Sequence, residues 1–226
     1  MPVRRKCDRV TSRPTAPRPK RAARGPLPAD GQAGALPVSS AQAIRLAAVR
    51  LFFEQGYAET TLRQVAQASG LKVSSLYNHM SSKEELLFEI MKGVMTDLIA
   101  VSEAALEQVT DQVERLDCFV RAGIRFHAEH QHAALIGNSE IRALSAAKRR
   151  AVVRLRDQYQ TTFERLLQDA VEAGRIQVPD VKLAAYAGIA ILNHVASWYE
   201  PDGRLSLDEV EAGLVATYAP ISQRSH

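Results

Sequence analysis

The chain has 226 residues, of which 46% are hydrophobic, so it can bury a sizeable core in a small head and a larger body. Its longest apolar stretch, residues 183–196, is too short for a membrane span and contains polar side chains, so we expect a soluble, cytoplasmic protein without membrane contact. The sequence contains no glycine-rich phosphate loop, nucleophile elbow or internal repeat, which argues against an enzyme and gives no reason to expect a cofactor or a metal.

The positive charge of the chain is concentrated at its N-terminus. Residues 1–38 hold nine Lys or Arg against two Asp, a net charge of +7, whereas the whole chain carries +4. They also hold seven of the ten prolines and no periodic apolar pattern, so we expect a disordered basic tail. Such a tail beside a DNA-binding domain would neutralise phosphates, although a solvated extension or a misassigned start codon would give the same composition.

Residues 39–86 predict three helices in a helix-turn-helix domain. Apolar residues recur at helical spacing over residues 40–55, and a glycine ends the run. A second, shorter helix begins after Thr61, because Thr61 and Gln64 form a capping box that satisfies free backbone N–H groups. Gly70 then permits a sharp turn, since a residue without a Cβ takes the left-handed conformation at little cost. The third helix leaves this turn at a steep angle, as in DNA-binding proteins.

The third helix is expected to present a polar face to DNA. Helical spacing places Leu76 and Met80 on one face and short polar side chains on the other, where they can approach base edges in the major groove. The expected DNA-binding residues are Thr61, Lys72, Ser74, Ser75, Tyr77, Asn78, His79 and Lys83, of which Thr61, Tyr77 and Lys83 are better placed for phosphates and Ser74, Ser75 and Asn78 for bases. A small helical core with a polar surface and no role in DNA binding would show the same generic pattern.

A set of residues across this region gives a more specific signal. They are Ile44 through Phe52, Gly56, Tyr57, Thr61, Val65, Ala66, Gly70, Leu76, Tyr77, His79 and the run from Ser82 to Leu86. Together they resemble the TetR family of bacterial transcriptional regulators, although Met80 and Lys72 depart from the residues common at those positions. The resemblance implies a homodimeric repressor that binds a near-palindromic operator in double-stranded DNA and leaves it when a small-molecule effector binds.

The remainder of the chain predicts a helical body and completes an all-α protein of about nine helices. Residues 87–220 would form the ligand-binding and dimerisation domain, followed by a short tail over residues 221–226. Helix breaks are expected near residues 110, 131, 145, 174–179 and 201–203. No segment shows the alternation and hairpin turns of β-strands.

Residues 181–199 predict a helix that is buried on two sides. One face holds Ala184, Ala187, Gly188, Ile191 and Val195, and a narrow opposite line holds Tyr186, Ala190, Asn193 and Ser197. Small residues allow close helix approach, so the first face would pack against a second copy of the chain, together with a final helix over residues 206–218. Tyr186, Asn193 and Ser197 would then point into the body, as ligand contacts or as mutually satisfied core groups. The pattern leaves open which face has which role.

Positive charge also gathers in residues 141–165, which carry +5 although residues 87–226 sum to −4. Arg142 and Arg149 are expected ligand contacts, because guanidinium groups bind phosphate through paired hydrogen bonds, while a solvated helix face is the simpler explanation. The Arg-rich helix and the run from Trp198 to Ser206 also resemble TetR members related to repressors of fatty-acid and steroid catabolism. That resemblance implies an acyl-coenzyme A effector, with phosphates on the arginines and the acyl chain in the apolar body.

Three other interpretations stay open at this point. A TetR-type sensor of apolar drugs that controls efflux would leave the arginine cluster without a ligand. A non-specific architectural DNA-binding protein would discriminate little between an operator and random DNA. A small enzyme would use a metal bound by His127, His130 and His132 with a nearby Glu, although no close cysteine pair supports such a site.

Overall fold

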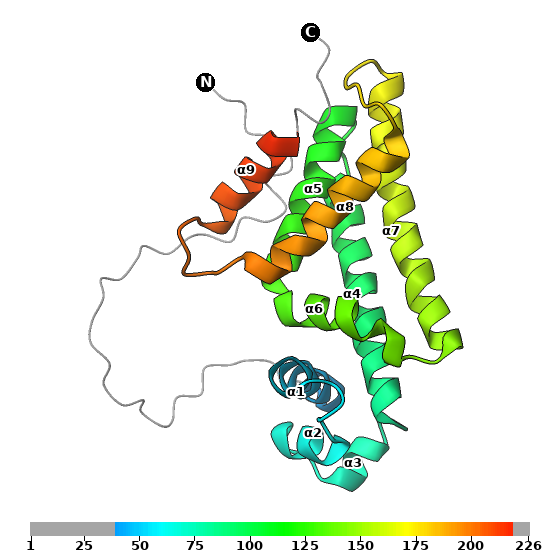
Figure 1. Ribbon diagram of the computed structural model, residues 1–226, viewed down its shortest axis with the longest axis vertical. Coiled ribbons are helices and arrows are strands. Elements are labelled where there is room, and N and C mark those ends of the chain that lie inside the picture. The colour runs from blue at the N-terminus through cyan, green and yellow to red at the C-terminus, as the bar shows by residue number, and fades with distance from the viewer. Residues whose placement is uncertain (1–38, 219–226) are drawn as a thin grey trace, which may run out of the picture.

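The computed structural model describes residues 39–218, and every element within them is a helix (Figure 1). The elements are α1 (Ser40–Gln55), α2 (Leu62–Ala68), α3 (Val73–Tyr77), α4 (Lys83–Leu106), α5 (Gln112–Glu129), α6 (Gln131–Ser139), the 3₁₀ helix η2 (Glu140–Ala143), α7 (Ala146–Glu172), α8 (Val181–Trp198) and α9 (Leu207–Tyr218). The all-α prediction is confirmed. Both predicted tails lie outside the described residues. Within residues 39–218, no helix is both long enough and apolar enough to span a membrane.

The head consists of α1, α2 and α3, and its local signals are those that the sequence predicts. The backbone N–H of Thr61 donates to Gln64 Oε1 at 2.7 Å, and the N–H of Gln64 donates back to Thr61 Oγ1 at 3.2 Å, which completes the capping box. Gly70 has a φ of +72° at the turn between α2 and α3. Ser82 caps α4 by accepting from the N–H of Glu85 at 3.0 Å.

The core of the head extends into the body. Ile44, Val65 and Leu76, from the three head helices, are fully buried in one apolar cluster. The same cluster contains Met91 from α4 and Val152 from α7. The head is therefore packed against the body through side chains that belong to both.

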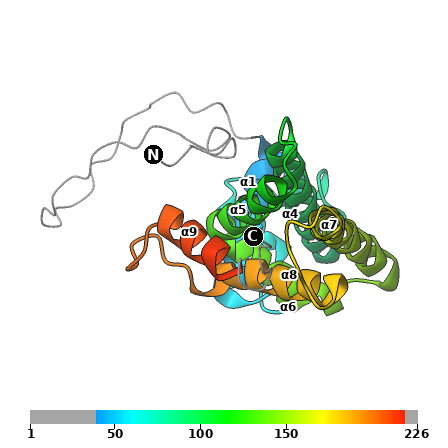
Figure 2. The ribbon, with the colours of Figure 1, turned by 90° about the horizontal axis from the view of Figure 1, so that it is seen from above.

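The body is a bundle built around α4, α5, α7 and α8, with α6 lying across its end nearest the head (Figure 1). Its centre is aromatic: the ring of Phe119 on α5 stacks on Tyr159 and Phe163 of α7, with centroids 4.8 and 5.1 Å apart. Seen from above, α7 and α9 lie on opposite sides of the bundle (Figure 2).

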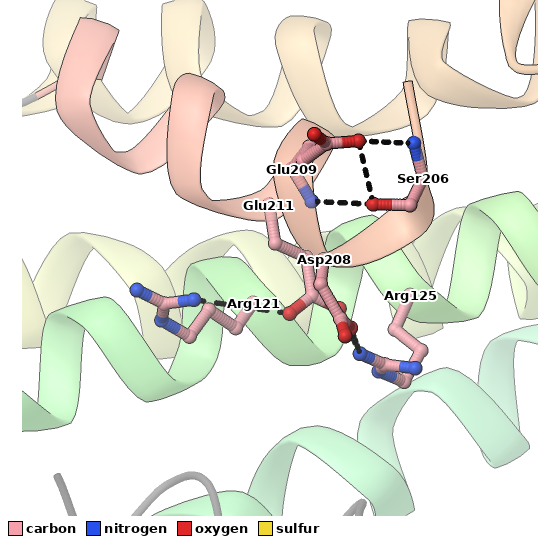
Figure 3. Close-up of polar contacts among 6 residues, drawn as sticks. All are labelled: Arg121, Arg125, Ser206, Asp208, Glu209 and Glu211. Atoms are coloured by element: carbon pink, nitrogen blue, oxygen red, sulfur yellow. Dashed lines mark hydrogen bonds and ion pairs between the residues drawn. The ribbon is translucent and has the colours of Figure 1, made fainter. Parts of the chain in front are cut away.

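Helix α9 is held on α5 by ion pairs (Figure 3). Arg125 Nη2 lies 2.7 Å from Glu211 Oε1 and 2.9 Å from Asp208 Oδ1, and Arg121 Nη1 lies 3.8 Å from Glu211 Oε2. Glu211 is buried whereas Asp208 is exposed. Burial raises the pKa of the Glu211 carboxyl, and the two arginines oppose that shift.

The structure shows which face of α8 packs within the chain, a point that the sequence left open. Ala184 and Val195 are buried in the body core and Gly188 is also buried, so this face packs within one chain, where α8 adjoins α5, α6 and α7. Tyr186 is half exposed and Ser197 is exposed, so the prediction that both point into the body is wrong. Small residues permit close approach to any helix, and the neighbours here belong to the same chain.

Candidate DNA-recognition face and ligand cavity

The exposed side of α3 has the composition expected of a recognition surface. Leu76 is fully buried and Met80 packs against the same core, which confirms the orientation predicted for this helix. Of the residues predicted to bind DNA, Thr61, Lys72, Ser74, Tyr77, Asn78 and His79 are exposed, while Ser75 and Lys83 are partly buried. The contacts of these residues with DNA stay predictions.

Lys83 has a structural role that the sequence did not reveal. Its Nζ donates to the carbonyl oxygens of Tyr57 at 2.8 Å and Ala58 at 2.9 Å, and it lies 4.5 Å from the centroid of the Tyr57 ring. Lys83 thus ties the start of α4 to the turn between α1 and α2. A phosphate contact would require the ammonium group to share or leave these carbonyls, so we treat Lys83 as a positioning residue.

A cavity of about 230 Å³ lies in the body between α4, α5, α6, α7 and α8. Its apolar wall includes Met91, Val94, Met95 and Leu98 from α4, and its polar lining is His127, Asn138, Arg156, Tyr159, Gln160 and Asn193. Asn193 is the one predicted ligand residue that lines it. Arg142, Arg149, Tyr186 and Ser197 are exposed and lie outside this lining.

Arg156 supplies positive charge to the edge of the cavity. Its Nη2 donates to the carbonyl oxygen of Gly137 at 2.8 Å, and within residues 39–218 no carboxylate pairs with it. Burial lowers the pKa of its guanidinium group. Arg156 belongs to the basic segment of residues 141–165, but the sequence alone does not distinguish it from the other arginines there. It is four residues after Val152 and three before Tyr159, both buried, and this spacing marks the inner side of α7.

His127 and Tyr159 lie deeper, at 4% and 3% exposure. Both ring nitrogens of His127 and the hydroxyl of Tyr159 are buried without a partner in hydrogen-bond geometry, although the Ser102 hydroxyl is near Tyr159. Burial lowers the pKa of His127 to about 4, and the neighbouring His130 adds to the shift. His127 is therefore neutral at neutral pH.

The three histidines considered for a metal do not assemble into a site in the described part of the chain. His130 stacks on Phe126, with centroids 4.3 Å apart, and His132 stacks on Phe53 at 3.8 Å. Only His127 of the three lines the cavity described above. The geometry thus gives the metalloenzyme interpretation no support.

The head and the body together define a class of protein. A helix-turn-helix head with a polar third helix, joined by the long α4 to a helical body that contains a cavity, is the architecture of a DNA-binding regulator with a separate sensing domain.

Comparison with known proteins identifies the family. The family described as "Bacterial regulatory proteins, tetR family" matches residues 44–90, and "Tetracyclin repressor-like, C-terminal domain" matches residues 109–219. The HTH-type transcriptional repressor KstR2 of Mycolicibacterium smegmatis is 30% identical over 179 residues, covering 77% of this chain and 86% of the relative. The chain belongs to the TetR family of bacterial transcriptional regulators, whose members are DNA-binding regulators and not enzymes.

Two solved structures extend the similarity to three dimensions. The TetR family transcriptional regulator PfmR from Thermus thermophilus has a TM-score of 0.72 and 35% identity, covering 77% of this chain and 96% of that one. AibR in complex with isovaleryl coenzyme A and operator DNA has a TM-score of 0.72 and 26% identity, covering 79% and 97%. The resemblance predicted from the sequence is confirmed.

Proposed function

We propose that this chain is a transcriptional repressor that leaves its operator when an acyl-coenzyme A thioester binds in the body. TetR regulators bind operator DNA and small-molecule effectors and act as dimers. The observation that carries the effector class is the cavity beside Arg156, where an apolar interior meets a cation that no carboxylate of the described residues neutralises. In an acyl-coenzyme A thioester, the acyl chain matches the apolar interior and the anionic coenzyme A matches the cation.

The volume of the cavity limits what enters it. Pockets for drug-sized ligands measure about 300–1,000 Å³, so the cavity of about 230 Å³ is small by comparison. That space suits a short or medium acyl group, so coenzyme A itself would lie outside. Arg149 lies on the same side of α7 as Arg156, two turns nearer the head, and Arg142 is exposed on η2. We assign the phosphates of coenzyme A to Arg156 at the edge of the cavity and to these exposed arginines.

The relatives support this assignment. AibR, at 26% identity, was solved with isovaleryl coenzyme A and operator DNA together. KstR2 of Mycolicibacterium smegmatis, at 30% identity, is a repressor by name. An effector that joins a small acyl group to coenzyme A is thus in keeping with both the cavity and a related protein.

We assign operator recognition to the exposed side of α3. Ser74 and Asn78 would contact base edges in the major groove, with Lys72 at the start of the helix. Thr61 and Tyr77 flank this surface and would contact phosphates, which fix the orientation of the head on the duplex. The remaining predicted residues would have smaller parts, since Ser75 is partly buried and His79 lies past the end of α3.

Two residues connect the cavity to the head. Met91 and Val152 line the cavity and also belong to the apolar core that contains the three head helices. A ligand that moves these side chains would change how the head sits on the body. The dimer has one conformation whose two heads fit the operator and another whose heads do not. The operator is released if the ligand binds more tightly to the second conformation.

The experiment is fluorescence anisotropy of the protein on its own upstream DNA at fixed salt, titrated with acyl-coenzyme A thioesters of four to ten carbons and with the matched free acids. We expect release by thioesters and none by the acids. Arg156→Met should raise the concentration of thioester at half-release about tenfold, without changing DNA affinity. Release by apolar drugs and by no thioester would contradict the proposal and favour the drug sensor.

Asn78→Ala is the matched variant for the DNA side of the proposal. It should reduce the preference for operator over random DNA about fivefold or more, because one good base contact contributes about 1–3 kcal/mol of discrimination. Thioester binding should be unchanged, since α3 is remote from the cavity. Equal binding of the unsubstituted protein to operator and random DNA would instead indicate an architectural protein.

A further inference from the structure

The unpartnered groups of His127 and Tyr159 carry information about the effector. Both side chains are more than nine-tenths buried and both line the cavity. Buried polar groups in native proteins almost always have a hydrogen-bond partner. Both ring nitrogens of His127 lack one among the described residues, and the Tyr159 hydroxyl has only the nearby Ser102 hydroxyl, which is outside hydrogen-bond geometry. These atoms can therefore donate a hydrogen bond to, or accept one from, a polar atom that enters the cavity.

The fold brings the two groups to one face of α5. A Cβ at Gly123 would lie 2.8 Å from the Tyr159 hydroxyl, so this hydroxyl rests against the backbone of α5 at that position. His127 follows four residues later and lies one turn along the same face. Stacking on Phe119 fixes the ring that carries the hydroxyl. Imidazole and phenol thus line the cavity about one helical turn apart along α5.

The protonation of the pair selects a neutral partner. At neutral pH the imidazole has one donor and one acceptor nitrogen, and the phenol donates and accepts. Arg156 directs its guanidinium group at Gly137 of α6, whereas the Tyr159 hydroxyl lies against α5. A carboxylate at the pair would lack a cation, so a carbonyl or hydroxyl oxygen is the better match.

We infer that His127 and Tyr159 bind a carbonyl or hydroxyl oxygen on the acyl chain, away from the thioester, so that the effector is an oxo- or hydroxyacyl thioester. This inference rests on the proposed function. The thioester itself must join coenzyme A outside, so it lies near the more exposed lining residues Asn138, Gln160 and Asn193. The buried pair is left for an oxygen further along the chain.

Isothermal titration with the full chain tests this, using hexanoyl- and octanoyl-coenzyme A and analogues with a single keto or hydroxyl oxygen at each position beyond carbon 2. At least one oxygenated thioester should bind about tenfold tighter than its saturated counterpart. Tyr159→Phe keeps the ring and should remove this advantage, because it should weaken the oxygenated thioester about tenfold more than its saturated counterpart. Tyr199→Phe deletes a hydroxyl outside the cavity lining and should change neither.

Other outcomes separate the two proposals. If thioesters bind but no oxygenated analogue is preferred, the inference is wrong and the proposed function stands. If Tyr159→Phe weakens saturated and oxygenated thioesters equally, the pair contacts the thioester carbonyl and the inference is again wrong. If no thioester binds at all, the proposed function fails and the inference fails with it. His127→Gln provides a second variant if Tyr159→Phe does not fold.

Discussion

A single buried histidine should make the stability of the protein depend on pH. The pKa of His127 is about 4 in the folded protein and returns to about 6.5 when the chain unfolds. Between these values the unfolded chain binds a proton that the folded protein does not, so a falling pH favours unfolding. We expect this residue alone to reduce the free energy of unfolding by about 2 kcal/mol between pH 7.5 and pH 5.

Urea unfolding of the unsubstituted protein and His127→Gln at equal concentrations checks this expectation. Between pH 7.5 and pH 5, the free energy of unfolding should fall less in the variant than in the unsubstituted protein. The difference should be about the 2 kcal/mol assigned to His127. Carboxylates such as Asp111, whose pKa is lowered by backbone hydrogen bonds, destabilise both proteins alike as they become protonated. Parallel curves for the two proteins would show that His127 does not titrate as described.

Residue roles set by near neighbours in the chain were predictable from the sequence, and roles set by distant contacts were not. Thr61 and Gly70 act through residues within a few positions, so the capping box and the turn were predicted correctly. Lys83 reaches carbonyls 26 and 25 residues earlier, which no local pattern reveals. The sequence did not distinguish Arg156 from the other arginines of α7, because charge alone does not show which arginine faces the cavity.

At the scale of elements, the attachment of α9 to α5 depends on one buried carboxylate. Glu211 is the acidic residue that both Arg121 and Arg125 approach, and its side chain is 8% exposed. Asp208 meets Arg125 with a side chain that is 87% exposed. Glu211→Gln should therefore lower the free energy of unfolding by about 1–3 kcal/mol, since it leaves partly buried guanidinium groups poorly paired.

Asp208→Asn is the matched control for this change, because it also removes one negative charge opposite Arg125. Solvent screens the exposed pair, so we expect little change in stability. Thermal unfolding of the two variants at one protein concentration gives the comparison. If Asp208→Asn destabilises the protein as much as Glu211→Gln, burial of Glu211 is not the cause.

The ends of the helices were largely predictable from the sequence. Which side of each helix is buried was only partly predictable. Caps and breaks near residues 110, 131, 145 and 174–179 come from local backbone chemistry, and the structure ends or begins helices close to each. The face of α8 that would meet another chain was not fixed by its sequence. Ala184 and Gly188 suit close packing against any helix, and only the neighbouring helices decide which one.

For the whole molecule, the outward face of α8 is the best candidate for the dimer interface. Leu183 is 66% exposed and Tyr186 is 50% exposed, and Ala190 and Ser197 are exposed on the same side of the helix. Large apolar side chains in such a row are costly to leave in water. A two-fold axis beside α8 would bury these side chains against the same side chains of a second copy of the chain. The dimer could then place its two heads on one operator.

Leu183→Asp should therefore produce monomers at micromolar concentration, because two facing copies would bury unpaired carboxylates beside each other. Sedimentation velocity measures the change, and operator binding should weaken at least about tenfold, since a single head contacts half of the site. Val101→Asp introduces the same charge at a 42% exposed apolar residue on α4 and should remain dimeric. A dimer that survives Leu183→Asp but not Val101→Asp would move the interface away from α8 and toward the end of α4.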